Sequence, residues 1–206
     1  MITEAMLTLW GKRIKQACLR EGVFDDAFSG HCDAFALALQ EVCKEESIPC
    51  ALVRIERQRM VSAPGPKILE HNPLSHVVVE VSFKSDQGLG MQKVCMDASG
   101  VDADVSWEEN WLQPYQNPES DEDEEQAEDH FSYHPIKAKE LKILRQSRDR
   151  RDVDVNYQCV YRNLIAEQWF QLKQAGFKET SISTNAFEEA ARQSVKNPCK
   201  NNKNIF

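Results

Sequence analysis

One segment decides the fold: residues 75–83, with the sequence Ser-His-Val-Val-Val-Glu-Val-Ser-Phe. Its side chains alternate, so that three valines and a phenylalanine fall on one face, while a histidine, a valine, a glutamate and a serine fall on the other. Period-two alternation with β-branched residues predicts a strand. Residues 84–90 contain an aspartate and two glycines, which favour a turn, and residues 92–97 predict the returning strand of a hairpin. Residues 50–56 predict a third strand.

A helix rich in alanine and leucine is predicted before these strands. Residues 32–44 carry apolar side chains around most of the helix circumference, which indicates a buried central helix, and Pro49 follows its end. Such a helix needs an apolar surface to pack on, and the valine face of residues 75–83 provides one. We therefore expect an α+β fold in which this cysteine-bearing helix packs on an antiparallel sheet. Further helices are predicted at residues 3–19, 136–146, 157–175 and 184–195.

The 206 residues suffice for one well-buried core. We expect residues 1–115 to form that core, 116–129 an acidic flexible loop, 130–195 a helical part of the same domain, and 196–206 a frayed tail. Seven of the 33 acidic residues lie between positions 121 and 129, and the net charge is −8. This charge argues against nucleic acid and anionic membranes as partners.

The sequence gives no sign of export or membrane insertion. No apolar stretch reaches the roughly 18–20 residues that span a bilayer, and the first residues lack the order of a signal peptide. Seven cysteines without a CxxC pair are typical of reduced thiols. We therefore expect a cytoplasmic protein, or one delivered into a host or target cytoplasm without the usual signal peptide.

Three residues suggest nucleophilic catalysis. Cys32 begins the buried helix, where unpaired backbone N–H groups and the helix dipole favour a thiolate. His76 lies near the start of one strand, on the face opposite the main row of valines, and Asp97 ends the next strand. In an antiparallel hairpin the start of the first strand neighbours the end of the second, so we expect His76 and Asp97 to lie side by side. The expected roles are nucleophile, base and orienting carboxylate.

Each of these residues also has a structural interpretation. Cys32 could be a small residue at a helix start, His76 a histidine satisfied in the core, and Asp97 a cap for the turn that follows it. His31 could line the site, although neighbouring residues at a helix start point apart, which favours a structural role. A metal site made of His31, Cys32, His71 and His76 lacks zinc-like spacing, so neither a metal nor another cofactor is expected.

Three motifs occur in a characteristic order: Gly-His-Cys at 30–32 before the alanine-rich helix, His-Val at 76–77 in a strand, and Asp-Ala-Ser-Gly at 97–100. This order resembles the papain-like and transglutaminase-like superfamily of thiol enzymes, especially compact bacterial members of unassigned role. The resemblance covers roughly residues 28–102. It implies an acyl-enzyme formed on a carboxamide or thioester, with deamidase, transglutaminase or peptidase activity on a protein or peptide.

The resemblance also suggests what should surround the nucleophile. Papain-type enzymes usually supply a glutamine upstream of the cysteine for the oxyanion, and residues 19–31 contain none. We therefore expect an oxyanion hole of backbone N–H groups, with help from Ser29 or His31. Compact bacterial enzymes of this build often serve as effectors or toxins, which is one expectation for the role. The alternative is a non-catalytic protein-binding module on the same fold.

Overall fold

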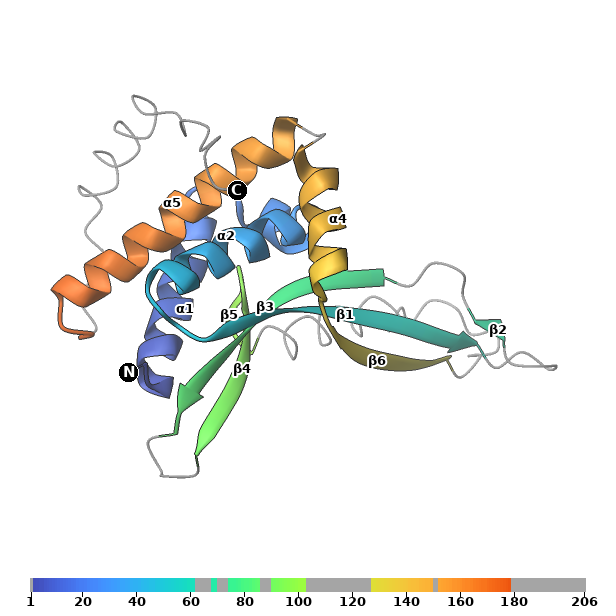
Figure 1. The fold of residues 1–206 in the computed structure, drawn as a ribbon, viewed down its shortest axis with the longest axis horizontal. Helices are drawn as coiled ribbons and strands as arrows, with labels where there is room; N and C mark the ends of the chain where they lie inside the picture. The colour runs from blue at the N-terminus through green and yellow to red at the C-terminus, as the bar shows by residue number, and fades with distance from the viewer. Residues whose placement is uncertain are drawn as a thin grey trace, which may run out of the picture.

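The protein has an α+β fold in which the helices gather on one side of an antiparallel sheet (Figure 1). The computed structural model describes residues 2–61, 68–69, 74–85, 90–102, 127–149 and 152–178. In this part of the chain the strands form one six-stranded sheet, with the order β2-β1-β3-β4-β5 and with β6 also paired to β1. The predicted fold class, a cysteine-bearing helix packed on an antiparallel sheet, is confirmed at this level.

Strand β1 (Cys50–Val61) holds the sheet together, because it pairs with three other strands. Its first half pairs with β3 (Leu74–Lys84), and its far end pairs with β2 (Ile68–Leu69). Strand β6 (Ala127–Pro135) pairs with β1 from Val53 to Val61. The hairpin continues from β3 to β4 (Met91–Asp97), which then turns into β5 (Gly100–Val101). All of these pairings are antiparallel, as the sequence predicts for its three strands.

The helices form the other layer. Helix α1 (Glu4–Arg20) is capped by Thr3, whose side chain accepts a hydrogen bond from the Met6 N–H. A short π-helical turn, η1 (Asp26–Gly30), leads into α2 (Cys32–Glu45). After the sheet come α4 (Ala138–Asp149) and α5 (Asp152–Gln174), which crosses over α2 (Figure 1).

Helix α2 is the centre of the hydrophobic core, as its composition predicts. It lies between α5 and the strands β1, β3 and β4, and its residues from Ala34 to Leu39 are buried. The alternating residues of β3 that the sequence places on one face join the same core: Val77, Val79, Val81 and Phe83. Burial of a side chain of this kind stabilises the fold by about 1.5–3 kcal/mol. The opposite face of the sheet carries a smaller cluster built from Val53, Ile55 and Val78.

Strand β6 corrects two expectations. The expected acidic loop, 116–129, overlaps the strand at its last three residues, and the expected helical part, 130–195, begins with the rest of it. From His130 to Pro135 the segment alternates polar and apolar side chains, with Phe131, Tyr133 and Pro135 on one face, which is typical of a strand although the segment was expected to belong to the helical part. It forms a strand because the long β1 presents a row of backbone groups that need partners.

Other expectations shift or fall outside the described residues. Strand β1 extends to Val61, well past the expected end at residue 56, and α5 begins at Asp152 rather than 157. The expected helix at 184–195, most of the acidic loop and the tail at 196–206 lie outside the part of the chain that the structure describes.

Two glycines bring α1 into direct backbone contact with the turn between β4 and β5. A Cβ atom on Gly11 would lie 2.8 Å from the backbone nitrogen of Val101, which is closer than real Cβ atoms approach. Gly100 has φ +111° and faces the Gly11 carbonyl, where a Cβ would lie 3.3 Å from the oxygen. This turn begins at Asp97, so α1 supports the end of the strand that carries the predicted orienting carboxylate.

We predict that Gly11→Ala destabilises the protein. Alanine favours a helix over glycine by up to about 1 kcal/mol, but here its methyl group would push α1 away from Val101, at a cost of about 1–3 kcal/mol. Thr8→Ala, at an exposed position of the same helix, is the matched control and should change stability by less than about 0.5 kcal/mol. Urea denaturation measures both. Equal stabilities for the two variants would contradict the close packing.

Candidate functional site

Cys32 is the first residue of α2, as the sequence predicts. The turn before it closes when the His31 N–H donates to the Asp26 carbonyl at 2.6 Å, and the helix begins with the Phe35 N–H donating to the His31 carbonyl at 3.0 Å. The N–H groups of the first turn have no acceptor within the helix, and they favour a negative charge placed beside them. The side chain of Cys32 is only partly buried. A thiol in this position can therefore become a thiolate and still meet a substrate.

His76 and Asp97 lie together, as the hairpin geometry predicts. The imidazole Nε2 is 2.7 Å from the Asp97 Oδ2, although the residues are 21 positions apart, and each side chain is at most 2% exposed. The pairing of β3 with β4 ends at Val79 opposite Met96, so His76 lies just beyond the end of β4. On its other side it pairs with Ile55 of β1.

The carboxylate of Asp97 is held by the turn that follows it. Its Oδ1 accepts hydrogen bonds from the Ser99 N–H and from the Ser99 hydroxyl, both at 2.6 Å. This is the turn-capping role that the sequence leaves as an alternative for Asp97. The structure shows that the two roles are compatible, because one carboxylate oxygen caps the turn while the other faces His76. No role for Ser99 is predicted from the sequence, although its position two residues after an aspartate is typical of such a turn.

The Cys32 thiol is close enough to the His76 imidazole to influence its pKa. The Nε2 atom of the same ring faces Asp97. Burial lowers the pKa of His76, but hydrogen bonds to Asp97 and Cys32, together with their negative charges, outweigh it and raise the pKa to about 9. At neutral pH the ring is therefore an imidazolium between two acidic groups. It can stabilise a thiolate and later give its proton to a leaving group.

Phe28 screens this group from water. Its ring centre lies 5.5 Å from that of His76, and it packs against the cluster of Val53, Ile55 and Val78 on the same face of the sheet. Phe28 comes from η1, the turn directly before the nucleophile. Exclusion of water strengthens the hydrogen bonds and charges inside the site. Phe28 is not predicted from the sequence, because a single phenylalanine in a loop does not indicate which side chain it will cover.

His31 packs against α5 instead of joining Cys32, His76 and Asp97, the candidate triad. Its ring stacks on Tyr157 with centres 4.3 Å apart, and the Tyr157 hydroxyl donates a hydrogen bond of 3.3 Å to Asp26. The contact ties α5 to the turn that precedes Cys32. The structural interpretation of His31 therefore has direct support, and the expectation that His31 lines the oxyanion site has none in this packing. The side chain of Ser29 is outside what the structure describes.

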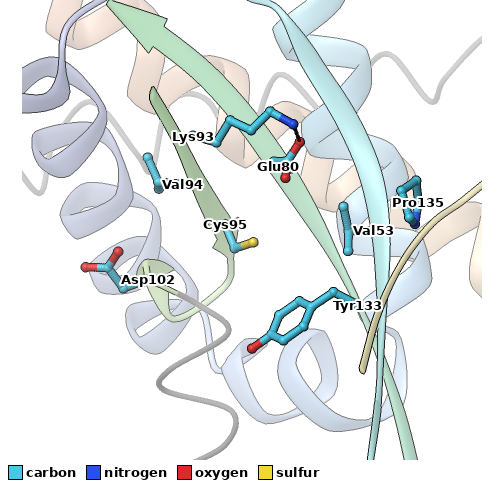
Figure 2. Close-up of a pocket in the computed structure, with 8 residues that line it drawn as sticks. All are labelled: Val53, Glu80, Lys93, Val94, Cys95, Asp102, Tyr133 and Pro135. Carbon is cyan, nitrogen blue, oxygen red and sulfur yellow. Dashed lines mark ion pairs between the residues drawn. The ribbon is translucent and has the colours of Figure 1, made fainter. Parts of the chain in front are cut away.

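A hollow of about 420 Å³ lies on the sheet near Glu80, Cys95 and Tyr133 (Figure 2), and none of Cys32, His76 and Asp97 is among its lining residues. Cys95 lines it and precedes Asp97 by two residues, so both side chains lie on the same face of β4. Val53, another lining residue, pairs with Val78, which follows His76 by two residues. The volume is within the range of about 300–1,000 Å³ that binding sites occupy. The hollow is therefore large enough to hold part of a ligand on this side of the sheet.

We predict that His76 is protonated at neutral pH. Nitrogen-15 NMR of the imidazole, assigned with His76→Gln, should show a pKa near 9 in the wild type. Cys32→Ala and Asp97→Asn should each lower it, because each removes a hydrogen bond and a negative charge that favour the imidazolium. A wild-type value at or below the ordinary 6.5 would show that burial dominates, and the ion pair would be ruled out.

The described residues contain no group of three or more His, Cys, Asp or Glu side chains that could hold a metal ion. No helix within the described ranges has the length and apolar character to cross a membrane. Comparison with protein-family models, with curated proteins and with solved structures finds no match for this chain. Its function has to be inferred from the geometry of Cys32, His76 and Asp97.

Proposed function

We propose that this protein is a cysteine-dependent enzyme of papain-like or transglutaminase-like type that cleaves an amide or transfers its acyl group. The observation that carries the proposal is the buried pair of Asp97 and His76 beside the partly exposed thiol of Cys32 at the start of α2. The order of the central helix and the following hairpin agrees with the resemblance. A histidine with a purely structural role needs a hydrogen-bond partner, which Asp97 supplies. It does not also need a partly exposed thiol at a helix start.

The residues suggest a two-step mechanism. The Cys32 thiolate attacks the carbonyl carbon of the substrate, and the oxygen becomes an oxyanion. The imidazolium of His76 then gives its proton to the leaving nitrogen, the C–N bond breaks, and a thioester to Cys32 remains. In the second step water or an amine loses a proton to His76 as it attacks the thioester, which releases Cys32. Asp97 keeps the ring oriented throughout.

The oxyanion is assigned to the backbone at the start of α2. No glutamine is available between residues 19 and 31, and His31 is stacked on Tyr157. The Ala34 N–H already donates to the Asp33 carboxylate at 2.8 Å, so the N–H of Cys32 itself is the best placed donor. One donor of this kind typically contributes about 3–4 kcal/mol to transition-state stabilisation. The role expected of Ser29 stays a proposal.

A protein or peptide is the proposed substrate. The hollow offers both apolar and polar surface: Val53, Pro135 and the ring of Tyr133 lie near the ion pair of Glu80 and Lys93, whose atoms are 2.7 Å apart (Figure 2). Such a mixed lining suits a polypeptide segment better than a purely apolar ligand. Deamidation, transglutamination and peptide cleavage share the first step and differ in the leaving group or the acceptor.

We predict that Cys32 is alkylated first. With iodoacetamide at about pH 6.5, where ordinary thiols are mostly protonated, mass-spectrometric mapping should find Cys32 labelled before Cys18 and Cys95. His76→Ala should slow the labelling, because it removes the cation beside the thiolate. Asp97→Asn should affect labelling less but should lower turnover of an amide substrate by at least about 10²-fold.

The internal control is Cys50, which is partly exposed like Cys32 but lies at the other end of α2. Its rate should be the same in the wild type and in His76→Ala. If Cys32 labels no faster than Cys95 and is indifferent to His76, the enzyme proposal fails, and a protein-binding module on the same fold takes its place.

A further inference from the structure

A pair of thiols lies near the C-terminal end of α2, opposite the end that carries Cys32. Cys43 is in the last turn of this helix, and Cys50 is the first residue of β1. Between them the chain reverses tightly: the Ile48 N–H donates to the Cys43 carbonyl at 2.7 Å, and Ser47 takes a left-handed conformation with φ 56°. The backbone therefore returns Cys50 to the helix turn that holds Cys43.

The side chains complete this approach. The Cys50 sulfur lies 4.0 Å from the carbonyl of Gln40, which is one helical turn before Cys43. Each thiol shifts the pKa of the other, as expected of two neighbouring sulfurs. Cys43 is fully buried, whereas Cys50 is partly exposed. One sulfur of the pair can thus meet a reagent from solution, and the other is enclosed directly behind it.

The two thiols also have pKa values shifted in opposite directions. The hydrogen bond from the Cys43 thiol lowers the pKa of Cys50, against the opposing effect of burial, and the charge of Lys44 adds to it. The same hydrogen bond, together with burial, raises the pKa of Cys43. Cys50 is therefore the sulfur that ionises first. This is the arrangement of an attacking thiolate with a resolving thiol beside it.

We propose that Cys43 and Cys50 form a reversible redox site, oxidised to an intramolecular disulfide by a small-molecule disulfide such as oxidised glutathione. The Cys50 thiolate attacks one sulfur of the reagent, the reagent's S–S bond breaks, and one glutathione thiolate leaves. Cys43 loses its proton to that thiolate or to solvent and attacks the Cys50 sulfur, which expels the second glutathione. The protein loses two electrons and two protons, and one molecule of reagent is reduced to two thiols.

Two other described cysteines offer a contrast. Cys18 is fully buried, and burial together with the negative charge of Asp97 raises its pKa to about 12. Cys95 is partly buried on β4, two strands across the sheet from Ala51 of β1, and it lines the hollow. Neither cysteine has the partly exposed thiol with a buried thiol close behind it that the turn between α2 and β1 provides.

The test uses Cys32→Ser, so that the candidate nucleophile does not react. This protein is treated with oxidised glutathione at neutral pH, digested with trypsin without reduction and mapped by mass spectrometry. The tryptic peptides 21–44 and 45–54, which then hold one cysteine each, should appear joined, with a loss of two hydrogens. Dithiothreitol should separate them.

Two further variants separate the two sulfurs. In Cys32→Ser/Cys43→Ala the mixed disulfide with glutathione should persist at Cys50, and it should form roughly tenfold faster than at Cys95. In Cys32→Ser/Cys50→Ser neither the mixed disulfide nor the joined peptides should form. A stable glutathione adduct at Cys50 while Cys43 is intact, or a Cys50 no faster than Cys95, would overturn the proposal. The matched control is Cys32→Ser/Cys95→Ser, in which the joined peptides should form as before.

Discussion

The buried hydrogen bond between His76 and Asp97 is the interaction on which the rest of the site depends. Removing two such groups from water costs several kcal/mol, and the cost is recovered only when the geometry is good and every remaining polar atom has a partner. Here the second carboxylate oxygen is occupied by Ser99, and the imidazole also lies close to Cys32. Contacts outside the triad hold these atoms in place: the backbone of α1 against Gly100, and Phe28 against the ring.

Helix α2 is the second constraint, because its two ends place two thiols in different electrostatic surroundings. At the N-terminus the unpaired N–H groups and the imidazolium favour the thiolate of Cys32. At the C-terminus the helix dipole disfavours an anion, but Lys44 and the Cys43 thiol there favour the thiolate of Cys50. The helix can hold both ends fixed because its middle is buried between α5 and the sheet.

The sequence was sufficient where structure follows from local pattern and chain geometry. The alternation of residues 75–83 predicts β3, and the hairpin geometry places His76 beside Asp97 before any coordinates are considered. Strand β6 was not predicted although residues 130–135 alternate, because the alternating stretch is short, follows an acidic run and pairs with β1, which is distant in the sequence. Phe28 and Tyr157 were missed for a related reason: each acts on a side chain that is distant in sequence or lies on another element. Position and spacing indicate candidate site residues, while the residues that pack against them emerge only from the tertiary structure.

The central claim is that Cys32 and His76 form an ion pair in the resting protein, and the ultraviolet absorbance of the thiolate tests it most directly. The spectrum of Cys32→Ser is subtracted from that of the wild type over a range of pH, so that the other thiols cancel. The account predicts a difference of one thiolate per chain that is present in the wild type below the ordinary thiol range of about 8.5 and lost in His76→Ala. A difference that appears only near pH 8.5 or above, and is the same in His76→Ala, would contradict the account.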